Sequence, residues 1–155
     1  MDAIPMLPLD CKYTRDIDFT NRIITVRKDI SKNRQTETVD MPKQLHKYMT
    51  NVHRLHTYPA DDYVFSKSGI PGTILLGKNN FRFRFDKIRE LLGLSERYKL
   101  YSFKYTGGIK LVTSGASTWD VQKHFRYKSI DTTEKYIRRN IGQRSEKIRE
   151  DFPDI

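Results

Sequence analysis

The chain has 155 residues and a net charge of +10, because 29 lysines and arginines outweigh 19 aspartates and glutamates. This length predicts one domain with a core of its own. The cations are spread through the sequence, which favours a polyanionic partner and above all a nucleic acid. No apolar run approaches the roughly 20 residues that a membrane span needs, so no membrane partner is expected. Cys11 is alone, which excludes an internal disulfide.

Patterns for targeting and for metal binding are weak. The first residues, Met1 to Pro8, lack both the basic start and the sustained apolar stretch of a secretory signal. We therefore expect an intracellular, cytoplasmic protein. His53 and His56 could share a helix face but have no third ligand nearby, so neither a metal nor another cofactor is expected.

Short strands are predicted in the first quarter of the chain. Residues 16–19, 22–26 and 36–39 have strand composition, and a Thr-Asn turn separates the first two. They predict a small antiparallel meander. The connection 27–35 is polar and mostly cationic, so it should project into solvent or onto a ligand.

Helical periodicity begins after the strands. Pro42 is expected to start a helix through about residue 52. Residues 79–92 carry the clearest helical pattern, with one apolar stripe that we assign to core packing. The stripe consists of Phe81, Phe85, Ile88 and Leu92.

Further helices are predicted in the last third of the chain. One runs over about 102–112, a second starts at Ser117 and a third at Asp131. Asp120 and Glu134, each three residues after such a start, predict capping boxes. Together the elements predict a mixed α/β (α+β) fold that is mostly helical with a small antiparallel sheet. It is expected to be a single domain over residues 1–155, with an irregular lead-in (1–14) and a C-terminal tail (143–155) that includes a short helix.

Tyr136 is the first candidate for chemistry. Its neighbourhood is basic and polar, with four nearby cations: Lys128, Lys135, Arg138 and Arg139. A phenol normally titrates near about pH 10, so a nucleophilic role needs cations that stabilise the phenoxide. From local context alone, packing on an amphipathic helix is the favoured role of this side chain.

Four sequence blocks between Asp16 and Tyr136 support a catalytic role for Tyr136. They are DIDFTNRIITV, SKNRQTETVDMP, YSFKYTGG and SIDTTEKY. In order and spacing they resemble the catalytic domain of tyrosine recombinases, the phage-integrase family, and particularly the integrases of Bacteroides-type mobile elements. The resemblance implies that family's fold and a double-stranded DNA partner. It also implies site-specific cleavage and rejoining of DNA, without a metal, through a 3′-phosphotyrosyl intermediate.

The resemblance also implies roles for individual residues. Tyr136 matches the nucleophile, and Lys32 matches the lysine that protonates the leaving 5′ oxygen. Lys104 lies where the family's second arginine usually sits, and it keeps the charge but loses the bidentate fork. Tyr101 and Tyr127 fall at the two histidine positions, where a phenol can still donate a hydrogen bond to phosphate.

Some family features have no direct counterpart. His124 is a candidate substitute for the missing imidazole, although a surface histidine is the favoured interpretation. The first family arginine should precede Asp16, yet Met1 to Leu9 contains no arginine. Either the chain is a fragment of a longer integrase or it has lost that function, and we expect the family's amino-terminal DNA-clamping domain to be absent. We therefore expect impaired cleavage and weak, salt-sensitive DNA binding. The expected phosphate contacts are Lys32, Arg34, Lys104, Lys128 and Arg139.

Two alternatives stay open. The first keeps the fold and drops the chemistry, which gives an inactive DNA-binding relic or accessory protein of a mobile element. The second is an unrelated basic RNA-binding or structural protein that uses the aromatic stretch 81–85 for stacking, although a helical stripe fits that stretch better.

The resemblance further implies a homo-oligomer on DNA held by the C-terminal tail, and a bacterial or phage-encoded protein associated with the nucleoid.

Overall fold

The structure, a computed structural model, describes residues 12–77 and 79–141. Its contacts divide the chain into two compact units, residues 1–107 and residues 108–155. The boundary follows Gly107 and falls inside helix α3 (Ser102–Thr113). The predicted helix at about 143–152 and the segment Met1 to Leu9 lie outside the described residues.

The first unit begins with the predicted meander. A 3₁₀ turn leads into three strands that form one antiparallel sheet in the order β1-β2-β3, as expected. These elements are η1 (Thr14–Asp16), β1 (Ile17–Asp18), β2 (Ile23–Val26) and β3 (Glu37–Asp40). Ile24 at the centre of β2 pairs with Ile17 on one side and Val39 on the other. All three side chains are buried, so alternation along the strands fixes the register.

A short helical segment covers the sheet. The elements are α1 (Lys43–Lys47), a π-helical turn η2 (Tyr48–Val52) and η3 (Leu55–Thr57). The core that they share with the strands contains Ile17, Ile24, Met41, Leu45, Met49, Leu55 and Val64. We predicted one regular helix through residue 52, whereas the α-helix changes to a π turn at Tyr48. Thr50 lies in this turn and donates its side-chain hydroxyl to the His46 carbonyl at 2.9 Å, a contact that is common where helices deviate.

Helix α2 (Asn80–Leu91) carries the predicted apolar stripe, but only its first half is packed. Phe81 meets Phe65 edge-on at a ring distance of 4.9 Å, and Phe85 meets Phe103 at 5.9 Å. Ile88 and Leu92 are 52% and 65% exposed, so the assignment of the whole stripe to the core is wrong. A periodic pattern shows which face of a helix is apolar, but not which turns of that face find a partner.

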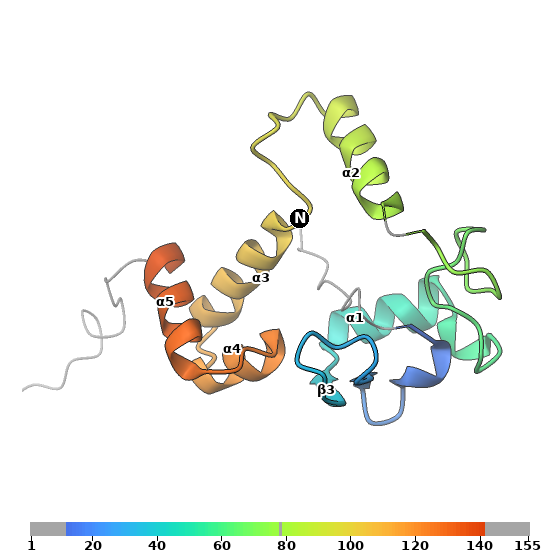
Figure 1. The fold of residues 1–155 in the computed structure, drawn as a ribbon, viewed down its shortest axis with the longest axis horizontal. Coiled ribbons are helices and arrows are strands. Elements are labelled where there is room, and N and C mark those ends of the chain that lie inside the picture. The colour runs from blue at the N-terminus through green and yellow to red at the C-terminus, as the bar shows by residue number, and fades with distance from the viewer. Residues whose placement is uncertain (1–11, 78, 142–155) are drawn as a thin grey trace, which may run out of the picture. The chain divides into compact units, whose positions relative to one another are not determined.

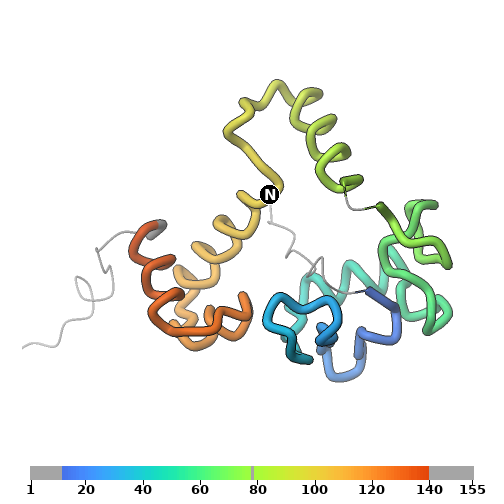
Figure 2. Tube along the Cα trace, in the orientation of Figure 1, coloured from blue at the N-terminus to red at the C-terminus, as the bar shows by residue number. Residues whose placement is uncertain are grey.

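The second unit contains the end of α3 together with α4 (Thr118–Phe125) and α5 (Ile130–Ile141). Helices α4 and α5 pack on each other, and the chain path between them can be followed in Figures 1 and 2. The predicted capping box is confirmed at α4, where Ser117 Oγ accepts from the Asp120 amide and Asp120 accepts from the Ser117 amide. The Ser117 hydroxyl also donates to the Asp120 carboxylate at 2.6 Å, and this hydrogen bond, together with that from the Ser117 amide, lowers the pKa of the Asp120 carboxyl.

The start of α5 differs from the prediction. The helix begins at Ile130, and the Ser129 hydroxyl accepts from the Thr132 amide at 3.3 Å. Ser129 therefore takes the capping position that we had assigned to Asp131, because a hydroxyl that directly precedes the helix reaches the first free amides. None of the helices among the described residues is long and apolar enough to cross a membrane.

Candidate functional site

Tyr136 lies in the interior of the second unit. Tyr136 is on α5 and is only 9% exposed, and Thr133, one turn earlier on the same helix, is completely buried. Its ring meets Phe125 from α4 edge-on at 5.6 Å and the Tyr127 ring at 6.1 Å. Tyr136 and Tyr127, two of the predicted site residues, are thus brought together, with Phe125 completing an aromatic cluster.

The backbone of Gly108 forms one wall of this cluster. A β-carbon at Gly108 would lie 2.7 Å from Tyr136 Cε1 and 2.8 Å from Phe125 Cε2, and it would overlap the Tyr136 hydroxyl oxygen. The neighbouring Gly107 has open space at the same position. Only glycine therefore lets the phenol rest directly on α3. Two glycines inside a helical pattern are a weak sequence signal for such close packing, and we predicted no role for either of them.

The connection from α4 to α5 fixes Tyr127. Arg126 ends α4 in the left-handed region at φ 54°. The Tyr127 amide donates to the Gln122 carbonyl at 3.0 Å, and the Gln122 side-chain amide donates to the Tyr127 carbonyl at 3.1 Å. His124, the candidate imidazole, is half-buried with its ring against Phe125 at 5.4 Å.

The cationic side chains of the second unit differ in their ion pairing. Lys128, between α4 and α5, is exposed, and so is Arg139 on α5. Arg138 lies 3.5 Å from the Glu134 carboxylate, so its charge is partly neutralised. Lys128 and Arg139 are therefore better placed than Arg138 to meet a polyanion in solvent.

In the first unit, Lys32 lies in the turn between β2 and β3. It is exposed, whereas Ser31 before it is 6% exposed. The side chains of Ser31, Asn33 and Glu37 are joined by hydrogen bonds across this turn. The exposure of Lys32 agrees with a connection that projects into solvent or onto a ligand, whereas the buried Ser31 and the hydrogen bonds across the turn were not predicted.

An ion pair supports the base of the turn. The Asp16 side chain is fully buried and accepts from Arg27 Nε at 2.6 Å. This hydrogen bond raises the pKa of the Arg27 guanidinium. The Arg27 carbonyl in turn accepts from the amides of Ile30 and Ser31, which begin the turn. A buried carboxylate in η1 is thereby connected to the segment that carries Lys32.

Arg34, a predicted DNA contact, is exposed and has a left-handed backbone at φ 55°. Within the described residues, every non-glycine residue with positive φ is an arginine: Arg22, Arg34, Arg54 and Arg126. Left-handed backbone costs a residue with a β-carbon about 1–2 kcal/mol. Arginine at such positions therefore has an energetic cost that glycine would avoid.

Lys104 and Tyr101 are also brought together in the first unit. Lys104 lies on α3, and its Nζ is 5.5 Å from the centre of the Tyr101 ring, within cation–π range. Tyr101 precedes α3, is 53% exposed and meets Tyr105 edge-on at 5.4 Å. A charge and a phenol are thus held near each other.

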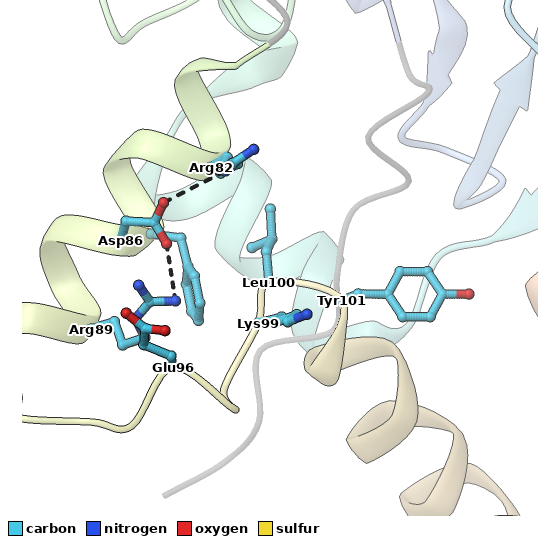
Figure 3. Close-up of a pocket in the computed structure, with 8 residues that line it drawn as sticks. Arg82, Asp86, Arg89, Glu96, Lys99, Leu100 and Tyr101 are labelled. Carbon is cyan, nitrogen blue, oxygen red and sulfur yellow. Dashed lines mark ion pairs between the residues drawn. The ribbon is translucent and has the colours of Figure 1, made fainter.

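Tyr101 also borders an open pocket of about 620 Å³ beside α2, drawn in Figure 3. Within it, Asp86 lies 3.2 Å from Arg89 and 3.7 Å from Arg82. The Tyr101 ring points away from these ion pairs in Figure 3. Because opposite charges offset each other here, the pocket does not form a concentrated anion site.

The fold is that of the catalytic domain of tyrosine recombinases. The crystal structure of XerA recombinase matches 95% of this chain, and 51% of its own length, with a TM-score of 0.66 at 16% identity. The Tn1549 transposon integrase in complex with circular intermediate DNA matches 84% of this chain, and 50% of its own, with a TM-score of 0.59 at 16% identity. The predicted fold class is confirmed.

Comparison of the sequence with known families identifies the family. The model of the phage integrase family matches residues 12–142, so the chain belongs to this family. A probable integrase/recombinase of Acholeplasma phage L2 is 28% identical over 125 residues, which are 81% of this chain and 41% of that protein. The chain thus spans about half or less of the length of these relatives. Membership of the family excludes the alternative of an unrelated RNA-binding or structural protein.

Proposed function

We propose that this chain is the catalytic domain of a site-specific DNA recombinase or integrase that cleaves and rejoins double-stranded DNA. The observation that carries the proposal is the position of Tyr136, which is fixed on α5 against Gly108 and Tyr127 inside the segment that matches the family. In the reaction, the Tyr136 hydroxyl loses its proton to water, its oxygen attacks a backbone phosphorus, and the bond from phosphorus to the 5′ oxygen breaks. A 3′-phosphotyrosyl link forms, and attack by a 5′ hydroxyl later reverses the step.

Different groups serve the two sides of this step. Lys32 supplies the proton to the leaving 5′ oxygen, and its exposure on the β2–β3 turn suits contact with DNA. Lys104, Tyr101 and Tyr127 stabilise charge on the phosphate. Because lysine offers a point charge in place of a planar fork, we expect slower cleavage than in relatives with arginine at the Lys104 position.

DNA binding rests on exposed cations. Arg34, Lys128 and Arg139 are exposed and contact backbone phosphates in this proposal. Such contacts release counterions, so affinity should fall steeply with salt. We also propose that the two units act as one catalytic domain, that the protein works in the cytoplasm at the nucleoid, and that copies associate on DNA through the tail, whose residues lie outside those described.

Capture of the covalent intermediate tests the proposal. The substrate is a pool of duplexes of randomised sequence, each with a nick beside the scissile position, so that the short released strand diffuses away and the adduct accumulates. We expect a protein–DNA adduct that survives denaturation and disappears in Tyr136→Phe. The matched control is Tyr98→Phe, which removes the hydroxyl of an exposed tyrosine in the other unit and should leave the adduct intact.

Two outcomes would contradict the proposal. An adduct that persists in Tyr136→Phe assigns the chemistry to another residue. DNA binding without any adduct supports the second candidate, an inactive DNA-binding accessory protein or relic. That candidate is favoured by the replacement of an arginine by Lys104 and of two histidines by Tyr101 and Tyr127.

A further inference from the structure

The carboxylate of Glu37 is the centre of the hydrogen bonds that close the β2–β3 turn. Glu37 is the first residue of β3. Its Oε2 accepts from Ser31 Oγ at 3.1 Å, and the Asn33 side-chain amide donates to Oε1 at 3.0 Å and to Oε2 at 3.2 Å. Ser31 and Asn33 are the immediate neighbours of Lys32. One carboxylate thus holds the chain on both sides of this lysine.

The backbone around Lys32 is ordered by further hydrogen bonds. The Asn33 amide donates to Ser31 Oγ at 3.2 Å, and the Arg34 amide donates to the Ser31 carbonyl at 3.0 Å. Ser31 itself is buried at the base of the turn. Lys32 is therefore an exposed side chain on a fixed backbone, which lowers the entropy lost when its ammonium is placed at a target.

The position of Glu37 is unfavourable for simple DNA binding. A carboxylate beside Lys32 and Arg34 reduces the positive potential that attracts phosphate. If the turn served only to attract DNA, a neutral residue would serve better. The benefit that offsets this cost is geometric, because the carboxylate is a strong acceptor that can hold two donors at once.

We propose that Glu37 is a positioning residue that holds Lys32 where its ammonium can protonate the leaving 5′ oxygen. The inference rests on the proposed function, in which Lys32 is the general acid. The Tyr136 phenol gives its proton to water as its oxygen bonds to phosphorus, the bond from phosphorus to the 5′ oxygen breaks, and a proton moves from Lys32 Nζ to that oxygen. Glu37 touches neither the DNA nor the proton and acts through the turn.

A change of leaving group isolates this effect. An alkoxide leaves poorly without a proton, whereas a thiolate leaves readily because thiols titrate at about pH 8.5. Duplexes with sulfur in place of the bridging 5′ oxygen therefore need no general acid. A defect in the delivery of the proton should vanish on the sulfur substrate, and a defect in the nucleophile or in folding should remain.

The experiment measures single-turnover adduct formation by the full chain on nicked duplex pools with a bridging 5′ oxygen or 5′ sulfur. We expect Glu37→Ala to be slower on oxygen by about 10- to 100-fold and close to wild type on sulfur, with Glu37→Gln in between. Lys32→Ala should show the same rescue, and adding Glu37→Ala to it should cause no further loss. Asp40→Ala removes an exposed carboxylate from the same strand and should match wild type on both substrates.

The outcomes separate the inference from the proposed function. Suppose that the sulfur substrate restores the rate of adduct formation of Lys32→Ala. If Glu37→Ala then forms adduct at the wild-type rate on the oxygen substrate, or slowly on both substrates, the proposed role of Glu37 is wrong and that of Lys32 stands. If Lys32→Ala is not rescued, or if wild type forms no adduct at all, the proposed function fails.

A second measurement needs no cleavage of DNA. Trypsin cuts after lysine and arginine only where the chain can open, so the ordered turn should resist cutting after Lys32 and Arg34. We expect Glu37→Ala to speed cutting at these two bonds by about tenfold, and Asp40→Ala to leave it unchanged. Equal rates in Glu37→Ala and wild type would overturn the inference whatever the adduct assay gives.

Discussion

The hydroxyl of Tyr136 on α5 lies against the backbone of Gly108 on α3, at the place where any other residue would carry its β-carbon. The Phe125 ring, from α4, lies against the same glycine. The position of the phenol in the second unit is therefore set by contact with main chain, which has little freedom to move, as well as by neighbouring side chains.

Replacement of this glycine tests how tightly the phenol is held. Gly108→Ala should lower the free energy of unfolding by about 1–3 kcal/mol, because the new methyl group overpacks the cluster. It should also slow adduct formation by displacing the hydroxyl. Gly107→Ala is the matched control, since its β-carbon meets open space. In a helix interior it should stabilise by about 0.5–1 kcal/mol. Chemical denaturation measures both, and equal effects of the two substitutions would contradict the close contact.

The buried carboxylate of Asp16 should be important for the stability of the first unit. Its side chain is fully buried and accepts hydrogen bonds from Arg27 Nε and from the Tyr13 amide. Asp16→Ala leaves these donors without their acceptor and should lower the free energy of unfolding by about 2–4 kcal/mol. Asp18→Ala removes an exposed carboxylate of β1 that accepts hydrogen bonds from Asn21, and it should have a smaller effect because these groups can bond to water instead. Urea titrations compare the two variants, and similar midpoints would show that Asp16 has no special role.

Arg34 offers a substitution with opposite effects on folding and on binding. Arg34→Gly should stabilise the fold by about 0.5–1 kcal/mol, because glycine adopts positive φ without strain. The same change should weaken DNA binding and reduce the slope of log affinity against log salt by about one. Arg54→Gly is the control, since Arg54 is exposed and left-handed but is not an assigned DNA contact. A loss of stability in Arg34→Gly, or equal DNA affinity of all three proteins, would refute this expectation.

The capping box of α4 should make stability depend on pH. Hydrogen bonds from Ser117 lower the pKa of Asp120 in the folded chain. The carboxylate therefore contributes stability above its unfolded pKa of about 4, and this contribution is lost as the pH falls through the lower folded pKa. Asp120→Asn should show a smaller drop in melting temperature between pH 7 and pH 3 than wild type. Asp40→Asn removes an equal charge and should keep the larger drop. If Asp120→Asn melts with the wild-type pH dependence, the cap does not contribute in this way.

Local patterns predicted the parts of the fold that depend on neighbours in sequence. The strand composition of residues 16–19, 22–26 and 36–39 was sufficient to predict the meander, and the spacing of Ser117 and Asp120 predicted a capping box. The end of the regular helix at Tyr48 was missed, because the apolar spacing gave no sign of the π turn in which Thr50 donates its hydroxyl to the His46 carbonyl.

The candidate site was predicted less completely. The resemblance to the family named Tyr136 and Tyr127, which the structure holds side by side, and Lys104 with Tyr101. It could not indicate Gly108, whose importance arises only when α3 and α5 are packed. Nor could it indicate the carboxylate that closes the β2–β3 turn, since an acidic residue at the start of a strand usually faces solvent.

The left-handed arginines have a consequence for how such a sequence changes over generations. Each of their codons is a single base change from a glycine codon, and the folded backbone at these places favours glycine. Where the arginine side chain is exposed, mutation and folding therefore both act toward loss of the guanidinium group, and its use in binding opposes that loss. In copies of this gene that are no longer selected to hold DNA, glycine should accumulate first at positions 22, 34 and 54.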